Sequence, residues 1–79
     1  MVKRFVIGTR YETEDGEINE ITSIEEGIVT VVNIKPPDDG GDCVGTKLIP
    51  DTDFNWEILN EAVDSGDWKI LAGGPEEVA

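Results

Sequence analysis

Apolar and polar positions divide the chain into several short β-type runs and one helical run. The strongest β signal is Ile28–Ile34, where β-branched residues occupy nearly every position. Both of its alternating sets of side chains are mostly apolar. This pattern is typical of a strand covered on both faces, at the centre of a barrel or under a helix.

A β-hairpin is expected before this strand. Arg4–Tyr11 is rich in β-forming residues, with Gly8 as a bend or bulge. Asp15 and Gly16 then favour a tight turn, because glycine readily takes the positive φ that such turns require. A second turn is expected at Glu25–Gly27.

The run between these turns, Glu17–Ile24, is ambiguous. Its isoleucines 18, 21 and 24 recur at a spacing of three, which also fits one face of a helix. The flanking turn residues and the β-branched content favour a strand with a bulge, in which Ile18 and Ile21 face the same side.

One clear helix is predicted at Phe54–Ser65. Asp or Thr residues just before it can serve as the N-cap, and Gly66 follows its end. Its apolar positions form a stripe of period 3.6 that predicts the buried face: Phe54, Ile58, Leu59, Ala62 and Val63. Trp56 lies beside this stripe, so we expect it to be partly exposed.

Short strands are expected on either side of the helix, at Thr46–Ile49, stopped by Pro50, and at Asp67–Leu71. We therefore predict one compact α+β domain over residues 1–71 and a flexible tail over 72–79. Its architecture would be an antiparallel bent sheet or open barrel of four or five strands with one helix.

Charge is the most informative compositional feature. The 79 residues include 18 Asp and Glu, 6 Lys and Arg and no His, for a formal net charge of −12. Such a surface repels nucleic acid and anionic membranes. The acids are scattered, a pattern typical of halophilic proteins that work in molar salt. Mimicry of nucleic-acid charge and an ordinary acidic domain are the alternatives.

Other features bound the setting. A lone Cys43 excludes an internal disulfide framework, and no apolar run reaches the roughly 18 residues of a membrane span. We expect a soluble, cytoplasmic protein.

The chain offers no candidate for catalysis or for a cofactor. It has no His, and no carboxylate lies within an apolar run that would shift its pKa. Cys43 lies among acids that lower its reactivity, so we expect it to be inert. We therefore predict a protein that is not an enzyme and has no cofactor.

Two groups of acidic residues are candidates for a metal site. Asp51 and Asp53 begin an EF-hand-like spacing, but Trp56 replaces the required Gly, and helix capping explains both aspartates. The loop Lys35–Gly45 carries three further aspartates (38, 39 and 42), for which a solvated loop is the simpler interpretation. We predict no metal site.

The candidate partner-binding residues lie on the helix: Trp56, Glu57, Glu61 and Asp64. An exposed aromatic residue among acids supplies both an anchor and a polar rim. Tyr11, Trp68 and Phe54 can join Trp56 in an aromatic pocket with an acidic rim, although core filling is the alternative. The basic residues Lys3, Arg4 and Arg10 are expected to pair with neighbouring acids.

The succession of strand, Asp-Gly turn, bent Ile-rich strand, glycine turn and apolar strand resembles the small SH3-like barrels, including the Tudor and KOW modules. The residues that carry the resemblance are Phe5–Tyr11, Asp15-Gly16, Ile18–Ile24, Gly27–Val32 and Trp68–Leu71. The helix departs from that pattern, because such barrels usually have only a short 3₁₀ turn at this place. The resemblance concerns the fold and implies no specific function.

Taken together, the sequence predicts a non-enzymatic acidic protein-interaction module of halophilic or viral origin. Its partner would be a protein with a basic surface or an apolar groove, with no direct contact to nucleic acid or membrane. The alternatives are a DNA-mimic inhibitor of a nucleic-acid-binding enzyme and a structural subunit of a larger assembly.

Overall fold

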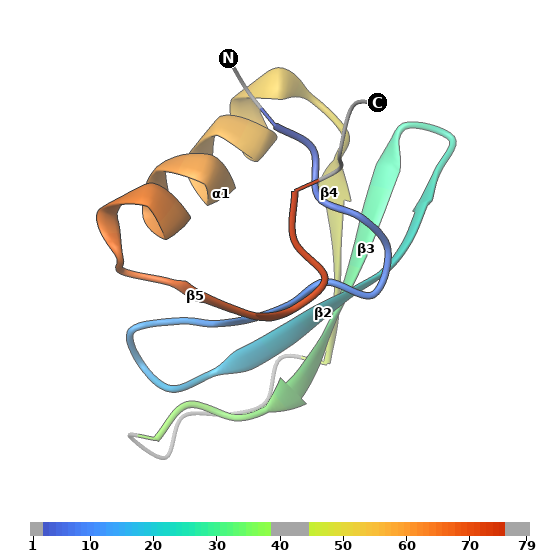
Figure 1. Cartoon of the computed structure of the whole chain (residues 1–79). Helices are drawn as coiled ribbons and strands as arrows, with labels where there is room; N and C mark the ends of the chain where they lie inside the picture. Colours follow the sequence, from blue (N-terminus) through green and yellow to red (C-terminus); the bar gives the residue numbers. More distant parts are fainter. Residues whose placement is uncertain (1–2, 39–44, 76–79) are drawn as a thin grey trace.

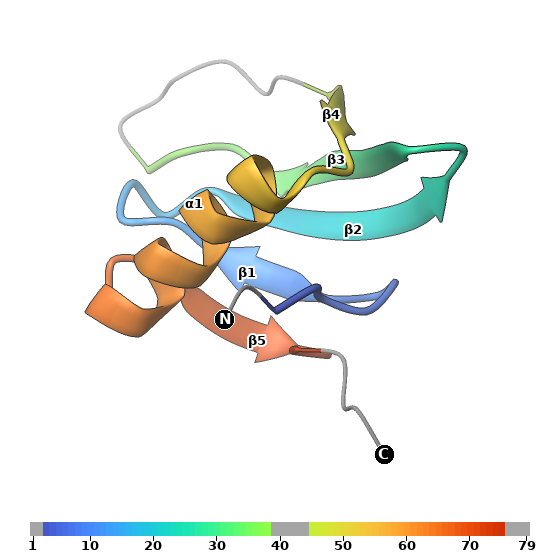
Figure 2. The ribbon, with the colours of Figure 1, turned by 90° about the horizontal axis from the view of Figure 1, so that it is seen from above.

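The computed structural model describes residues 3–38 and 45–75, which form one antiparallel sheet with a helix across one of its faces (Figures 1 and 2). The strands are β1 (Arg10–Glu12), β2 (Ile18–Glu25), β3 (Ile28–Lys35), β4 (Thr46–Pro50) and β5 (Lys69–Ala72), and the helix α1 spans Asp53–Ser65.

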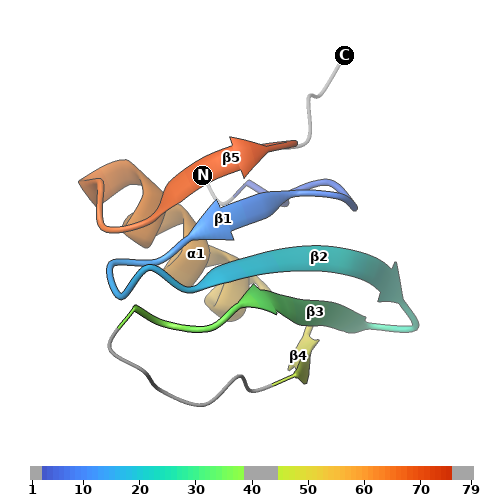
Figure 3. The ribbon, with the colours of Figure 1, turned by 90° about the horizontal axis from the view of Figure 1, so that it is seen from below.

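The strand order is β4-β3-β2-β1-β5. The first four strands follow one another, and α1 carries the chain from one edge to the other, where β5 pairs with β1 (Figure 3). The α+β prediction is therefore confirmed. The sheet is open, with β4 and β5 as its edges, so a closed barrel is not formed.

Two turns set the register of the hairpins. Between β2 and β3, Glu26 and Gly27 have φ values of 51° and 76°. Positive φ at both central residues is typical of the two-residue turn whose twist matches that of the flanking strands. Between β1 and β2, the Thr13 N–H donates to the Glu17 carbonyl at 2.8 Å, and Gly16 has φ 84°. Both predicted turns are confirmed.

The bulge in β2 is also confirmed, and the pairing shows which isoleucine it turns inward. The register with β3 shifts between Ile21 and Ser23. The extra residue brings Ile24 against the buried core together with Ile21. Ile18, which we expected on that face, is half-buried and lies outside the core cluster.

Two segments near opposite ends of the sequence, residues 5–9 and 73–75, lie side by side. Phe5 forms an isolated bridge with Pro75, and the Gly74 N–H donates to the Thr9 hydroxyl at 3.1 Å. Gly8 has φ 96° within a turn, so the predicted strand Arg4–Tyr11 is reduced to Arg10–Glu12. Residue 72 belongs to β5 and residues 73–75 are docked, so the predicted tail is wrong for these positions, and residues 76–79 lie outside the described residues.

The helix ends are as the sequence indicates. Thr52 is the N-cap and accepts a hydrogen bond from the Asn55 N–H, while Gly66 closes the helix with φ 87°. The predicted buried face is wrong in part. Phe54 is 71% exposed and Ile58 48% exposed, whereas Trp56 is only 4% exposed.

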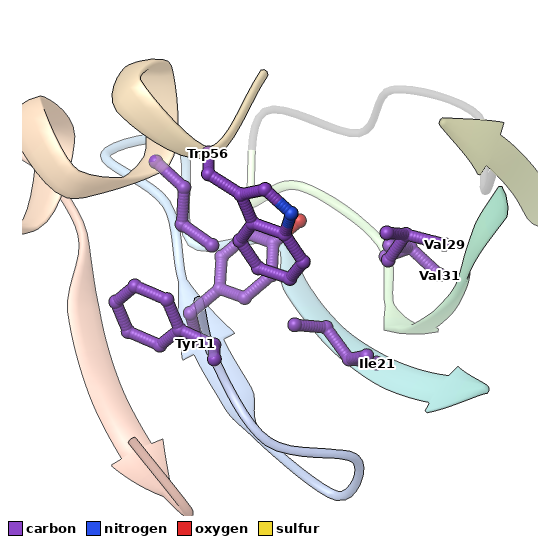
Figure 4. Packing of buried hydrophobic residues seen from close by; sticks show 7 residues of the cluster. Tyr11, Ile21, Val29, Val31 and Trp56 are labelled. Atoms are coloured by element: carbon purple, nitrogen blue, oxygen red, sulfur yellow. The ribbon is translucent and has the colours of Figure 1, made fainter. Parts of the chain in front are cut away.

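The core lies between α1 and the sheet (Figure 4). It consists of seven buried side chains: Phe5, Tyr11, Ile21, Val29, Val31, Trp56 and Leu59. The other face of β3 is only partly covered by the residues that the structure describes: Thr30 and Val32 are half-buried, and Ile28 and Ile34 are 37% and 46% exposed. The expected burial of both faces of this strand is therefore wrong for its outer face.

Candidate interaction surface

The outward side of α1 combines apolar and acidic side chains. The sequence spacing of these residues places them on the side opposite Trp56 and Leu59. We call this surface the acidic face, and it consists of five exposed residues: Phe54, Glu57, Ile58, Glu61 and Asp64. Three of the four predicted site residues lie on it, and Phe54 and Ile58 supply the apolar component.

The carboxylates of the acidic face have no cationic partner among the described residues. The described part of the chain forms three ion pairs, and all of them lie away from the acidic face: Arg4–Asp51, Arg10–Glu20 and Lys35–Asp38. The first two confirm the expected pairing for Arg4 and Arg10, whereas Lys3 forms no ion pair with a described residue. The negative charge of the acidic face is therefore left for solvent, salt ions or a partner.

This arrangement does not serve the stability of the helix. Glu57 and Glu61 are four residues apart, where like charges oppose helix formation by about 0.2–0.5 kcal/mol. Asp64 lies in the last turn, where the helix dipole favours a cation, and that turn holds no basic residue. Stabilisation of the helix therefore does not explain these acids, and an explanation has to come from the surface that they form.

Trp56, the predicted aromatic anchor, is unavailable to a partner. Its ring stacks on Phe5 with 6.3 Å between centroids, and its indole N–H donates to Asp51. The Arg4 guanidinium lies over the ring, 6.0 Å from its centroid. Asn60 fixes this cover, because its side-chain amide donates to the Lys3 carbonyl at 2.7 Å. The prediction that Trp56 is partly exposed is therefore wrong.

Asp51 thus has a different role from the capping that we expected. It accepts the hydrogen bond from the Trp56 indole and pairs with Arg4, while Thr52 caps the helix. Asp53 begins the helix, near the positive end of its dipole. The described residues contain no group of three or more His, Cys, Asp or Glu that could hold a metal ion. Residues 39, 42 and 43, considered above for cation binding and reactivity, lie outside the described residues.

Three of the four residues of the predicted aromatic pocket, Tyr11, Trp56 and Trp68, line one pocket beneath α1, whereas Phe54 faces outward. Within it, Tyr11 stacks on Trp68 with centroids 5.1 Å apart. Beside the Tyr11–Trp68 pair is a polar hollow of about 210 Å³. Six other residues line it: Thr13, Glu14, Asp15, Glu17, Asn19 and Lys47.

The electrostatics of Tyr11 reflect this setting. Burial, and to a lesser degree the charge of Glu17, raise the pKa of the Tyr11 phenol to about 12. The phenol is therefore neutral at physiological pH, and ionising it would oppose folding between about pH 10 and 12.

The part of the chain that the structure describes has no helix long and apolar enough to cross a membrane. No protein-family model, curated protein or solved structure matches the chain, so its function has to be argued from the geometry of the molecule.

Proposed function

We propose that the protein is a non-enzymatic interaction module that binds a protein partner through the acidic face of α1. The observation that carries the proposal is the exposure of Phe54 and Ile58, at 71% and 48%, between carboxylates that form no ion pair within residues 3–38 and 45–75. Large apolar side chains at such a place stay in contact with water when the chain folds. Burying them against a partner therefore contributes favourable free energy to binding.

The chemistry of this face defines the partner. An apolar socket would receive Phe54 and Ile58, and a rim of Lys or Arg would meet Glu57 and Glu61. Binding energy commonly comes from a few anchors enclosed by a polar rim. Complementary charge speeds association and makes it sensitive to salt. The partner is therefore a basic protein surface with an apolar groove.

The distribution of the acids favours this function over nucleic-acid mimicry, our alternative. A DNA mimic needs carboxylates in rows at phosphate spacing on one face. The acids here also occupy both hairpin turns, Glu14-Asp15 and Glu25-Glu26, in addition to α1. Dispersed acids suit a cytoplasmic protein of halophilic or viral origin, which is part of the proposal, and a subunit of a larger assembly is the third candidate.

The resemblance to SH3-like barrels is retained as a proposal about kinship of fold. What supports it is the succession of four strands in a meander, followed by a return strand, β5, that pairs with the first. The open sheet and the 13-residue helix α1 are the departures from that pattern.

The test is a quantitative pull-down from the native host at low and high salt. The site variant carries Phe54→Ser and Glu61→Lys. The matched control carries Leu48→Ser, at a side chain 69% exposed on the opposite side of the molecule, and Glu25→Lys in the hairpin. Both double variants change hydrophobicity and charge equally.

We expect one or more partners to be retained by the wild type and the control, lost from the site variant, and released as salt is raised. Equal recovery by all three proteins would move the site elsewhere, most plainly to the loop 35–45. Recovery of nucleic acid by the wild type would contradict the argument from charge.

A further inference from the structure

A second feature lies beneath α1, on the side of the helix that faces the sheet. It is a cavity of about 130 Å³ between the helix, β3 and the edge strand β4, and it is open to solvent on one side. Aliphatic side chains from both layers form most of its wall: Ile21, Val29, Val31, Ile49, Ile58 and Leu59. Tyr11, Trp56 and Trp68 add aromatic surface.

Two of the polar side chains beside the cavity are already bonded, whereas the Tyr11 phenol and the Trp68 indole N–H form no hydrogen bond with the described residues. At its rim, the Asn55 side-chain amide donates to the Pro50 carbonyl at 2.9 Å and to the Thr52 hydroxyl at 3.2 Å. In the wall, the Trp56 indole N–H donates to Asp51. Among the described residues, the one buried side-chain polar atom without a partner is the Thr13 hydroxyl, which does not line this cavity.

Water gains little in this cavity, because its lining is mostly apolar and a well-held water needs two to four polar partners. An apolar cavity of about 150 Å³, cut into a different protein, stays dry and binds benzene or xenon. The present cavity is close to that size and has a similar lining, and it differs in being open to solvent on one side.

We propose that this cavity is a binding site for a compact, uncharged aromatic molecule of about the size of benzene or indole. The aromatic walls favour a ring over an aliphatic chain, because ring–ring contacts contribute beyond the buried area. The net charge of −12 and the nearby Asp51 and Asp53 disfavour a carboxylated ligand.

The site meets the acidic face at one side chain, Ile58, which lines the cavity and is 48% exposed. The other residues of the acidic face do not line the cavity. The two proposals therefore need different residues apart from Ile58, and the variants that test each of them leave Ile58 unchanged.

The experiment is a titration of the ¹⁵N-labelled protein with benzene, followed by NMR. The indole N–H signals of Trp56 and Trp68 report on the wall. The backbone amide signals of Ile34 and Lys35, which do not line the cavity, serve as a reference. We expect saturable shifts at both tryptophans with benzene and with indole. Benzoate, which carries the same ring with a charge, is expected to bind at least tenfold more weakly.

Filling the cavity from its edge identifies the site. Ile49→Phe places a ring into the space from β4, and Leu48→Phe is the matched control, because Leu48 is 69% exposed on the other face of the same strand. We expect at least a tenfold loss of benzene affinity in the first variant and no change in the second.

A smaller change, Val31→Leu, repeats the test from the sheet if Ile49→Phe does not fold. Three results would overturn the proposal. They are the absence of saturable shifts up to the solubility of benzene, undiminished affinity in the filled variants, and benzoate affinity equal to that of benzene.

Discussion

The two sides of α1 show that apolar character alone does not decide which side chains of this helix are buried. On the side toward the sheet, Trp56 and Leu59 are 4% and 8% exposed. On the outward side, Phe54 is 71% exposed although it is as apolar as Leu59. Helical periodicity alone would have placed Phe54 inside and Trp56 at the margin.

What separates the two sides is the set of partners that other segments bring. Trp56 is enclosed by Phe5 and Arg4 from the start of the chain and bonded to Asp51 before the helix. Phe54 has no ring stacked on it in the described part of the chain. Burial here follows from tertiary contacts, and the outward apolar residues remain for a partner.

The largest expected effect comes from removing the ring that the inner side depends on. Trp56→Ala should destabilise the protein by about 3–5 kcal/mol, because it deletes a large buried side chain and leaves a cavity. Phe54→Ala, the matched change on the outer side, should cost less than about 0.5 kcal/mol. Urea unfolding of both variants measures the difference. Equal costs would mean that the two sides are assigned wrongly.

The next largest effect is expected from truncating a single aliphatic side chain on the same inner side of α1. Leu59→Ala should cost about 2–4 kcal/mol as a large-to-small change in the core. Glu57→Ala, on the acidic face, should cost less than about 0.5 kcal/mol. Thermal unfolding followed by circular dichroism is sufficient, and a comparable loss in both would argue against burial of Leu59.

These two pairs of substitutions also show which features of the fold could be predicted from the sequence. Local signals were sufficient for the turns at Gly16 and Gly27 and for the helix ends at Thr52 and Gly66, because each depends on the conformation of one or two residues. The orientation of the helix was not accessible in this way. It depends on contacts between segments up to 57 positions apart, such as that of Lys3 with Asn60.

The candidate site was predictable to the same extent. The acidic residues of the face, Glu57, Glu61 and Asp64, follow from helical spacing alone. Its apolar component was missed because Phe54 and Ile58 fit the stripe that normally faces a core. The one local signal for the burial of Trp56 is Asp51, five residues earlier, which can reach an indole N–H at the start of a helix.

A third prediction tests that signal. Asp51→Ala should destabilise the protein by about 1–3 kcal/mol, because it leaves the buried Trp56 N–H without an acceptor. Asp53→Ala, in the first turn, loses only a favourable interaction with the helix dipole, about 0.3–1 kcal/mol. Chemical unfolding compares the two. An equal effect would indicate that Asp51 acts through general charge and not through the indole bond.

The fourth prediction concerns the outer side as a whole. Stability should rise with salt by about 1 kcal/mol or more between roughly 0.1 M and 2 M KCl, because the Debye length falls from about 10 Å to below about 3 Å. For a domain of this size that corresponds to about 4–8 °C in the thermal midpoint. An uncharged osmolyte controls for solvent exclusion. A midpoint unchanged by KCl would contradict a Coulombic origin.

The smallest effect separates stability from function on the acidic face. Glu61→Lys removes the repulsion with Glu57 and creates an attraction in the favourable orientation, with the acid on the N-terminal side. We expect a gain of about 0.5 kcal/mol at low salt, about half of that for Glu61→Gln, and no gain for either in 1 M KCl. Unfolding of the wild type and of both variants, at low salt and in 1 M KCl, measures these differences in stability.

The same substitution reverses the charge that a basic partner would meet, so under the proposed function it must weaken binding while it strengthens the fold. A Glu61→Lys protein that is less stable than the wild type would mean that Glu61 makes a contact within the molecule. A protein that is more stable and binds equally well would indicate that the acids of this face are an adaptation to a saline environment and do not take part in recognition. Only gain of stability together with loss of the partner assigns the acidic face to recognition.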